Sequence, residues 1–369
     1  MDYSVLRRFS DLGGLLIIEV DGSMMEGGGQ ILRMALSYSA LLGVPTRVHN
    51  IRQGRSRPGL RPQHLKTAEA VALMCKGEAT GLRIGSSEIT LLPGPISGGN
   101  FEVDIGTAGS ITLLLQCLTP LTAFAGAPTS LVVHGGTNVR WSPPMPIMEN
   151  VTWAALESMG FQGSLSVKRE GFYPKGGGLV SADFKSVESL APLIAKGQRV
   201  SAEQGVSICG KLPGHVAERQ MGAAKARLRA AGMDAHIDVR VKLGRESPLS
   251  PGSVICLWVS ESPGIFIGSS SMGERGKPAE QVGEEAVDAF LYEVRSGAAV
   301  DRFTGDNLIL WCSLAEGESD FTVSQLTKHT ETAVELAQIF TGATIRVDSM
   351  ENGARIRIKG TGLRNPYID

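Results

Sequence analysis

The stretch Glu26-Gly-Gly-Gly-Gln-Ile-Leu-Arg33 places three consecutive glycines at the start of a predicted helix. The residues before it, LLIIEV (15–20), are typical of a short strand, and residues 21–23 are typical of a turn. Apolar residues spaced over 31–40 predict a helix that buries a broad face. This order indicates an α/β unit. Glycines in such a turn let backbone N–H groups approach a ligand, and a helix start favours an anion.

The same stretch offers a metal ligand. Glu26 is a candidate ligand for a divalent cation that would bridge to phosphate, and Arg33 lies one helical face away. The alternative is a tight turn before a capped helix, with no ligand.

Twenty residues further on, a basic segment carries five arginines and one lysine within residues 46–66, with no Asp or Glu. Its sequence RQGRSRPGLRP (52–62) is too rich in Gly and Pro for a helix, so Arg52 and Arg55 are expected on a loop. Arginine pairs bidentately with phosphate, so this loop suits a polyphosphate or a nucleic-acid end. The alternative is a solvated charged surface.

Composition limits the number of domains and the classes of protein to which the chain can belong. The chain has 369 residues, 42% hydrophobic residues and a net charge of −1, enough to bury a large core over two or three domains. The five cysteines stand singly, without CxxC or zinc spacing, and are expected to be buried, reduced thiols. The N-terminus lacks the apolar stretch of a signal peptide, and no apolar run is long enough to span a membrane. A cytoplasmic protein is expected.

A faint internal repeat predicts the architecture. A Gly-rich turn and helix at 26–36 recurs at 106–116, and a second helix at 63–77 recurs at 143–160. Each copy then leads into two strand-like segments and is expected to fold as β-α-β-α-β-β. A third copy is expected from about residue 268, and its elements are helix 278–295, strand 308–314, helix 327–340 and strands 344–348 and 354–358.

The segment 185–266 breaks the register of this repeat. It is expected to form a small inserted α/β domain with strands 199–208, 235–241 and 253–259 and a helix at 217–231. The main domain would then comprise 1–184 and 267–369. The alternative is a fourth, longer repeat.

Together these motifs resemble the RNA 3′-terminal phosphate cyclase family. The resemblance begins with Glu26–Arg33 and Arg52–Arg55 and covers the chain in order from about residue 16. Further motifs that match the family are Pro58-Gly-Leu-Arg-Pro-Gln-His-Leu65, Gly106-Thr-Ala-Gly-Ser110 with Gln116, Gly135-Gly-Thr137 with Pro143-Pro144, Gly171-Phe-Tyr-Pro174 with Gly176–Gly178, His215-Val-Ala-Glu-Arg219, Gly273-Glu-Arg-Gly276 with Ala279-Glu280, Asp306 and His329. Such a series is highly specific. The resemblance implies three β-α-β-α-β-β repeats, as in the enolpyruvyl transferase-like fold, with a small inserted α/β domain.

The resemblance also implies roles for individual residues. His329, at a predicted helix start, falls on the family's adenylated histidine, and a neutral imidazole is a competent nucleophile toward phosphorus. ATP is expected to contact Gln30, Arg33, Gln116, Pro143, Phe303 and Asp306. Asp306 would contact the nucleotide or orient His329. The RNA end is expected to contact Arg52, Arg55 and Gln63, and Glu26 is expected to hold Mg²⁺ or Mn²⁺. Two positions depart from the family pattern: Phe303 replaces a common tyrosine, and Ala333 replaces an asparagine.

The activity implied is ATP-dependent conversion of an RNA 3′-phosphate to a 2′,3′-cyclic phosphate, through a histidine-AMP and an RNA(3′)pp(5′)A intermediate. A monomer or a homodimer is compatible with the sequence. Three alternatives stay open: a ribosome-biogenesis factor of the same fold without the chemistry, an enolpyruvyl transferase, and a non-catalytic protein that binds RNA ends. The natural RNA and any reaction at 5′-phosphate ends are not readable from the sequence.

Overall fold

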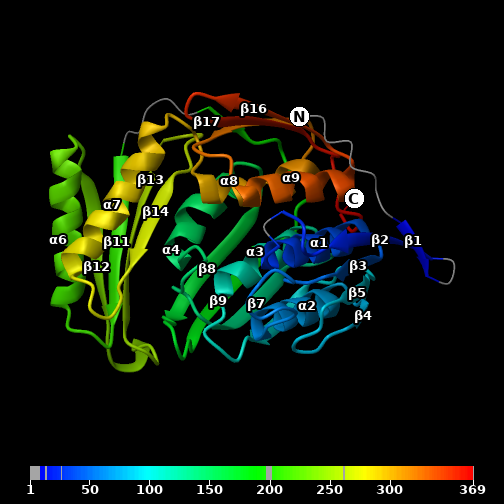
Figure 1. Cartoon of the computed structure of the whole chain (residues 1–369), viewed down its shortest axis with the longest axis horizontal. Coiled ribbons are helices and arrows are strands. Elements are labelled where there is room, and N and C mark those ends of the chain that lie inside the picture. The colour runs from blue at the N-terminus through cyan, green and yellow to red at the C-terminus, as the bar shows by residue number, and fades with distance from the viewer. Residues whose placement is uncertain (1–8, 13–14, 26, 197–201, 261, 369) are drawn as a thin grey trace.

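Four mixed β-sheets covered by helices form the molecule (Figure 1), as the computed structural model of residues 9–12, 15–25, 27–196, 202–260 and 262–368 shows. The expected α/β class is confirmed. Within these ranges, no helix has both the length and the apolar character needed to span a bilayer.

The first sheet contains the strand and helix predicted around the triple glycine. It has the order β1-β2-β3-β5-β4, in which β2 pairs parallel with β3, and β5 pairs antiparallel with both β3 and β4. Its elements are β1 (Phe9–Leu12), β2 (Leu15–Asp21), α1 (Gly29–Leu42), β3 (Thr46–His49), α2 (Pro62–Met74), β4 (Glu78–Thr80) and β5 (Ile89–Leu92).

The second sheet repeats this pairing in the order β6-β7-β9-β8. The order of helices and strands along the chain is also repeated, except that the second helix is broken into three short pieces, one of them a π-helix. Its elements are β6 (Gly99–Asp104), α3 (Ile111–Ala123), β7 (Thr129–Gly135), α4 (Met145–Ile147), η1 (Met148–Trp153), α5 (Ala154–Glu157), β8 (Gln162–Arg169) and β9 (Gly178–Lys185).

The third sheet has the order β10-β15-β17-β16 and again one parallel and two antiparallel pairings. Its elements are β10 (Ile194–Ala195), α8 (Arg302–Leu314), β15 (Glu318–Val323), α9 (Lys328–Thr341), β16 (Thr344–Met350) and β17 (Gly353–Lys359). The first strand of this sheet therefore lies well before residue 268, where the third copy was expected to begin.

The expected strand 308–314 is wrong, because these residues lie inside α8. Residues 308–314 are all buried, so this part of the helix shows no 3.6-residue alternation of buried and exposed positions. A short apolar run of this kind does not distinguish a buried strand from a buried helix. The helix begins where the Asp301 side chain accepts hydrogen bonds from the backbone N–H groups of Phe303 and Thr304, at 2.9 and 2.8 Å.

The fourth sheet has the order β12-β11-β13-β14 and lies at one end of the molecule with two helices on it (Figure 1). Its elements are β11 (Ala202–Gly210), α6 (His215–Ala230), β12 (Ala235–Lys242), η2 (Gly244–Glu246), β13 (Gly252–Ser260), β14 (Gly268–Met272) and α7 (Ala279–Arg295). The insert was expected to end at residue 266. The fourth sheet and its helices extend beyond that residue, because β14 pairs with β13 and α7 packs against α6 and β14. The division of the chain into two domains stays a prediction.

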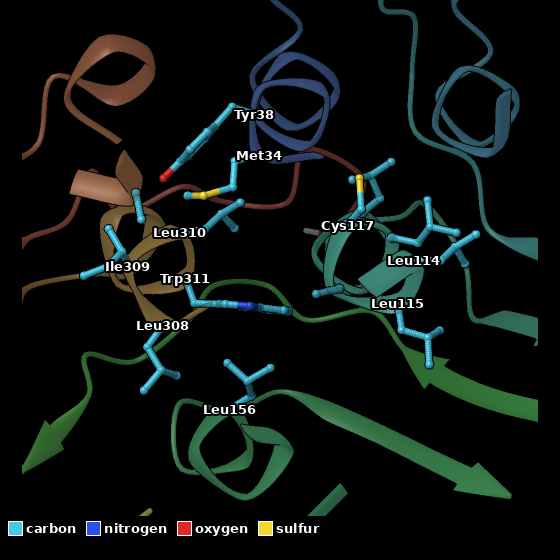
Figure 2. Packing of buried hydrophobic residues seen from close by; sticks show 14 of the residues in the cluster. Met34, Tyr38, Leu114, Leu115, Cys117, Leu156, Leu308, Ile309, Leu310 and Trp311 are labelled. Carbon is cyan, nitrogen blue, oxygen red and sulfur yellow. The ribbon is translucent and has the colours of Figure 1, made fainter. Parts of the chain in front are cut away.

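The helices of the first three sheets pack on one another in the centre of the molecule, where α1, α3, α8 and α9 meet. Figure 2 shows the Trp311 indole between Leu156 on one side and Met34 on the other. The Tyr38 ring stacks on Phe340 with centroids 5.1 Å apart. All five cysteines are buried and free of disulfides, as expected.

Candidate active site

His329 and Gln30 meet between two helix starts that are far apart in the sequence. His329 lies in the first turn of α9, and Gln30 lies in the first turn of α1. The imidazole Nδ1 is 2.6 Å from the Gln30 side-chain oxygen. The Gln30 amide nitrogen donates to the His329 carbonyl at 3.0 Å. Two hydrogen bonds therefore join one glutamine to one histidine.

This pairing defines which imidazole nitrogen carries the proton. Because the Gln30 amide nitrogen is committed to a carbonyl, the Gln30 oxygen is the group that faces His329 Nδ1. An oxygen acceptor requires Nδ1 to be the nitrogen that carries the proton when the imidazole is neutral. The lone pair then lies on Nε2, which is the tautomer that a nucleophilic Nε2 needs.

A buried carboxylate, Asp306, supports the start of the helix that carries His329. One Asp306 oxygen accepts from the hydroxyls of Thr330 at 2.6 Å and of Thr327 at 2.9 Å. Thr327 is the N-cap of α9, and Thr330 closes the capping box. These hydrogen bonds tie one oxygen of the Asp306 carboxylate to the threonines of the α9 turn.

The environment of Asp306 favours its neutral form. Burial raises the pKa of Asp306 to about 7, the hydrogen bonds from Thr330 and Thr327 act in the opposite direction, and the nearby Asp301 adds to the rise. Burial likewise raises the pKa of Asp301 to about 6.

A pocket lined by both polar and apolar side chains lies beside the His329–Gln30 pair, among α1, α3, η1, α5 and α8. Four of the residues proposed from the sequence to contact ATP line it: Gln30, Arg33, Gln116 and Asp306. The empty space among these residues is about 540 Å³, a figure that includes the open solvent at the mouth of the pocket. Its apolar wall includes Trp153 and Trp311.

Two further candidates lie outside the described lining of this pocket. Pro143 precedes α4, and its carbonyl accepts from the Thr112 hydroxyl at 2.8 Å. Phe303 is 61% exposed on α8, and the Arg302 guanidinium lies 5.3 Å from its ring centroid. Whether the two rings bracket one adenine stays a prediction.

The triple glycine contains a close contact that the sequence does not reveal. A Cβ atom on Gly29 would lie 2.4 Å from Nε2 of His64 and 3.0 Å from an Arg33 guanidinium nitrogen. A side chain at position 29 would therefore displace the His64 ring or the Arg33 guanidinium. Gly27 has a left-handed φ of +62°, so it serves the turn itself.

His64 is the candidate that sequence reasoning missed. Its Nδ1 accepts from the Arg61 backbone N–H at 3.2 Å, so the neutral ring carries its proton on Nε2, toward Gly29. Burial, together with the charges of Arg33, Arg52 and Arg61, lowers the pKa of His64 to about 3. The sequence signal that could have identified His64 is its position at the start of a helix, directly after an arginine loop.

The predicted arginine loop is present, between β3 and α2, but its two named arginines differ in setting. The Arg52 guanidinium donates to the carbonyls of Arg57 at 2.8 Å and Gly59 at 2.9 Å, so it shapes the loop. Burial lowers the pKa of Arg52, as do the charges of Arg55 and Arg61. Arg55 is exposed. The basic segment is also partly neutralised, because Arg47 donates to Glu88 at 2.6 Å.

Gln63 links this loop to the second sheet. Its side-chain oxygen accepts from the backbone N–H of Ser110 at 3.0 Å, and Ser110 is the N-cap of α3. The start of α2 therefore contacts the glycine-rich turn that precedes α3.

The expected metal ligand, Glu26, lies outside the described residues. Among the residues that the structure does describe, no group of three or more His, Cys, Asp or Glu side chains is arranged to hold a metal ion. A metal here would depend on substrate phosphate oxygens together with a carboxylate such as Glu26, which is how Mg²⁺ is usually bound beside nucleotides.

The fold and the pocket define an α/β protein that presents the His329–Gln30 pair and Arg33 at one pocket. The family model described as RNA 3′-terminal phosphate cyclase matches residues 24–347. The chain belongs to the RNA 3′-terminal phosphate cyclase family, which confirms the resemblance seen in the motifs.

Curated relatives agree along nearly their whole length. A protein of Methanopyrus kandleri named RNA 3′-terminal phosphate cyclase is 44% identical over 91% of this chain and 96% of its own. A Methanosarcina barkeri protein of that name is 43% identical over 91% and 98%. A Pyrococcus furiosus protein of that name is 41% identical over 90% of this chain and 95% of its own length.

Proposed function

We propose that this enzyme uses ATP to convert a 3′-terminal phosphate of RNA to a 2′,3′-cyclic phosphate, with His329 as the residue that carries AMP. Relatives named for this activity support the reaction class. The observation that carries the assignment of His329 is the hydrogen bond from its Nδ1–H to Gln30, because it leaves the lone pair on Nε2. ATP and an RNA 3′-phosphate end are the proposed substrates.

In the first step, Nε2 of His329 attacks the α-phosphorus of ATP. A P–N bond forms, the bond from that phosphorus to the bridging oxygen breaks, and pyrophosphate leaves. Arg33 lines the pocket beside Gln30 and is proposed to bind the charged phosphates. The N–H groups at the start of α9 favour the negative charge that develops next to His329.

In the second step, an oxygen of the RNA 3′-phosphate attacks the phosphorus of the histidine adenylate, and the P–N bond breaks. In the third, the neighbouring 2′-hydroxyl attacks the RNA phosphorus, loses its proton and expels AMP. AMP is a good leaving group, whereas an unactivated phosphate monoester has none. The last step is intramolecular, so proximity supplies much of its rate. Arg52, Arg55 and Gln63 are proposed to hold the RNA end.

A divalent cation, Mg²⁺ or Mn²⁺, is proposed to accompany ATP, with Glu26 as its protein ligand. When bound, it would neutralise charge on the departing pyrophosphate. Pro143 and Phe303 are proposed to contact the adenine, and Gln116 and Asp306 the nucleotide. The cytoplasm is the proposed compartment, and five buried cysteines without disulfides support a reducing environment.

One experiment separates this function from its rivals. The protein is incubated with ATP labelled at the α-phosphate and a divalent cation, and acid-labile, protein-bound AMP is measured. An RNA with a 3′-phosphate should then discharge the AMP and yield a cyclic end. A cyclase-like binding factor without the chemistry, or an enolpyruvyl transferase, would give no labelled protein.

A further inference from the structure

Trp141 is the one tryptophan of the four that reaches solvent. It is 93% exposed, whereas Trp153, Trp258 and Trp311 are at most 7% exposed. Its φ of +67° is left-handed, a conformation that a bulky side chain rarely adopts. The surrounding loop is nevertheless ordered by hydrogen bonds, from Met145 N–H to the Thr137 carbonyl at 3.2 Å among others. A strained backbone therefore holds a large aromatic ring in water.

A second exposed aromatic lies on the adjoining turn between β8 and β9. Tyr173 is 77% exposed. This turn is joined to the Trp141 loop, because the backbone N–H of Thr137 donates to the Gly171 carbonyl at 2.9 Å. It also packs on the glycine-rich turn before α3, where a Cβ on Gly176 would lie 2.8 Å from the Cα of Ala108. Both exposed aromatics therefore lie on loops that contact one another.

A series of hydrogen bonds links these two loops to Gln63, at the start of α2. Gln63, in the first turn of α2 beside His64, accepts from the Ser110 N–H at 3.0 Å. Ser110 lies 2.7 Å from the Thr112 hydroxyl, which in turn donates to the Pro143 carbonyl, two residues from Trp141. The turn before α3 exposes Gly106 and Thr107.

Positive charge lies beside Tyr173. Lys175 is exposed on the same turn, and its backbone N–H donates to the Ser250 hydroxyl at 3.1 Å. The Lys211 ammonium donates to the Leu249 carbonyl at 3.1 Å, next to that serine. Lys211 follows β11, and its contact with the β12–β13 connection brings a second lysine near this turn. Cations next to exposed aromatics are the combination that single-stranded nucleic acid binds.

We propose that Trp141 and Tyr173 stack on bases of the RNA a few nucleotides upstream of its 3′-phosphate, with Lys175 and Lys211 contacting the backbone. This proposal rests on the proposed function for its ligand, a single-stranded RNA end. Stacking on an aromatic ring tolerates every base, so the surface adds affinity without demanding a sequence. It also gives the fourth sheet a share in substrate binding.

The test uses the full-length protein and two substrates, a ten-nucleotide RNA with a 3′-phosphate and a dinucleotide with a 3′-phosphate. Trp141→Ala and Tyr173→Ala should each raise KM for the longer RNA about tenfold, and change KM for the dinucleotide less than about twofold. Trp141→Phe should restore KM, because the ring is kept. Tyr367→Ala, an exposed aromatic next to Gly126, is the control and should change neither KM.

Tryptophan fluorescence supplies a readout that does not depend on turnover. The longer RNA should quench the emission of the wild-type protein in a saturable way, and Trp141→Phe should abolish that quenching. Equal changes of KM for both RNA lengths, or unquenched wild-type emission at saturating RNA, would overturn the proposal. If the protein formed no histidine adenylate but RNA still quenched Trp141 emission, the proposed reaction would be wrong and the proposed RNA-binding surface would be supported.

Discussion

The imidazole Nδ1 of His329 lies 2.6 Å from the side-chain oxygen of Gln30, although 299 residues separate the two in the chain. The second hydrogen bond of Gln30, to the backbone carbonyl of His329, fixes the orientation of its amide. One side chain at the start of α1 thus sets the tautomer and the ring position of a side chain at the start of α9.

Replacing Gln30 tests this relationship. Gln30→Ala removes two hydrogen bonds worth about 1–3 kcal/mol together, so the rate of self-adenylation should fall about 10- to 100-fold. Gln30→Glu should place a carboxylate against Nδ1 and favour the imidazolium, which is not a nucleophile. Its rate should therefore be lowest near pH 6 and recover toward pH 8.5. A pH profile of Gln30→Glu that parallels the wild type would show that Gln30 does not control the tautomer.

The buried Asp306 predicts a pH-dependent stability. Its pKa is raised to about 7 in the folded protein, whereas an unfolded chain titrates near 3.9. Between about pH 4 and pH 7 the folded state binds more protons, so this group makes stability fall as pH rises. Asp306→Asn removes the titration and keeps an oxygen for Thr327 and Thr330. The Tm of the variant minus that of the wild type should increase from pH 4.5 to pH 7.5, and a constant difference would contradict the shift.

The two loop arginines should separate in their effects. Arg52→Ala loses hydrogen bonds to two carbonyls and should destabilise the fold by about 1–3 kcal/mol. Lysine should restore this poorly, because it lacks the planar fork. Arg55 is exposed, so Arg55→Ala should leave Tm unchanged, weaken binding of 3′-phosphate RNA and reduce its salt dependence by about one ion. Thermal melts and salt titrations of binding measure the two effects, and equal melting losses would refute the distinction.

The terminal ribose decides how far the reaction proceeds. An RNA whose last nucleotide is 2′-deoxy but carries a 3′-phosphate should accept AMP and then stop, because no 2′-hydroxyl is present to attack. The product joined 3′-to-5′ through pyrophosphate should accumulate to about one equivalent of ends, as gel mobility can show. A 3′-hydroxyl RNA should give neither product. Absence of the adenylated end from the deoxy substrate would argue against the second step.

Local patterns predicted much of the fold. The strand, glycine turn and helix around residues 15–42 are found in the structure, because turn chemistry and amphipathic spacing agree there. Patterns failed where burial is complete on all sides, as in α8. The extent of the fourth sheet was also missed, since β14 has a neighbour, β13, that only its pairing reveals.

Part of the candidate site was likewise predicted from the sequence, and part became visible only in the structure. Four residues predicted to contact ATP line one pocket, although they come from three helices of different copies. No local pattern could show that Gln30 contacts His329, because that contact spans two repeats. His64 was missed as a site residue although it stands at a helix start behind the arginine loop, because its packing on Gly29 becomes visible only in the structure.

The most direct test of the account is covalent labelling of His329. Wild-type protein, His329→Ala and His329→Gln are incubated with ATP labelled at the α-phosphate, and bound AMP is mapped by mass spectrometry of the peptide around residue 329. Circular dichroism confirms that the variants fold. We expect one acid-labile AMP per wild-type chain, attached to His329, and no label in either variant. Label retained in a folded His329→Ala protein, or located on another residue, would contradict the account.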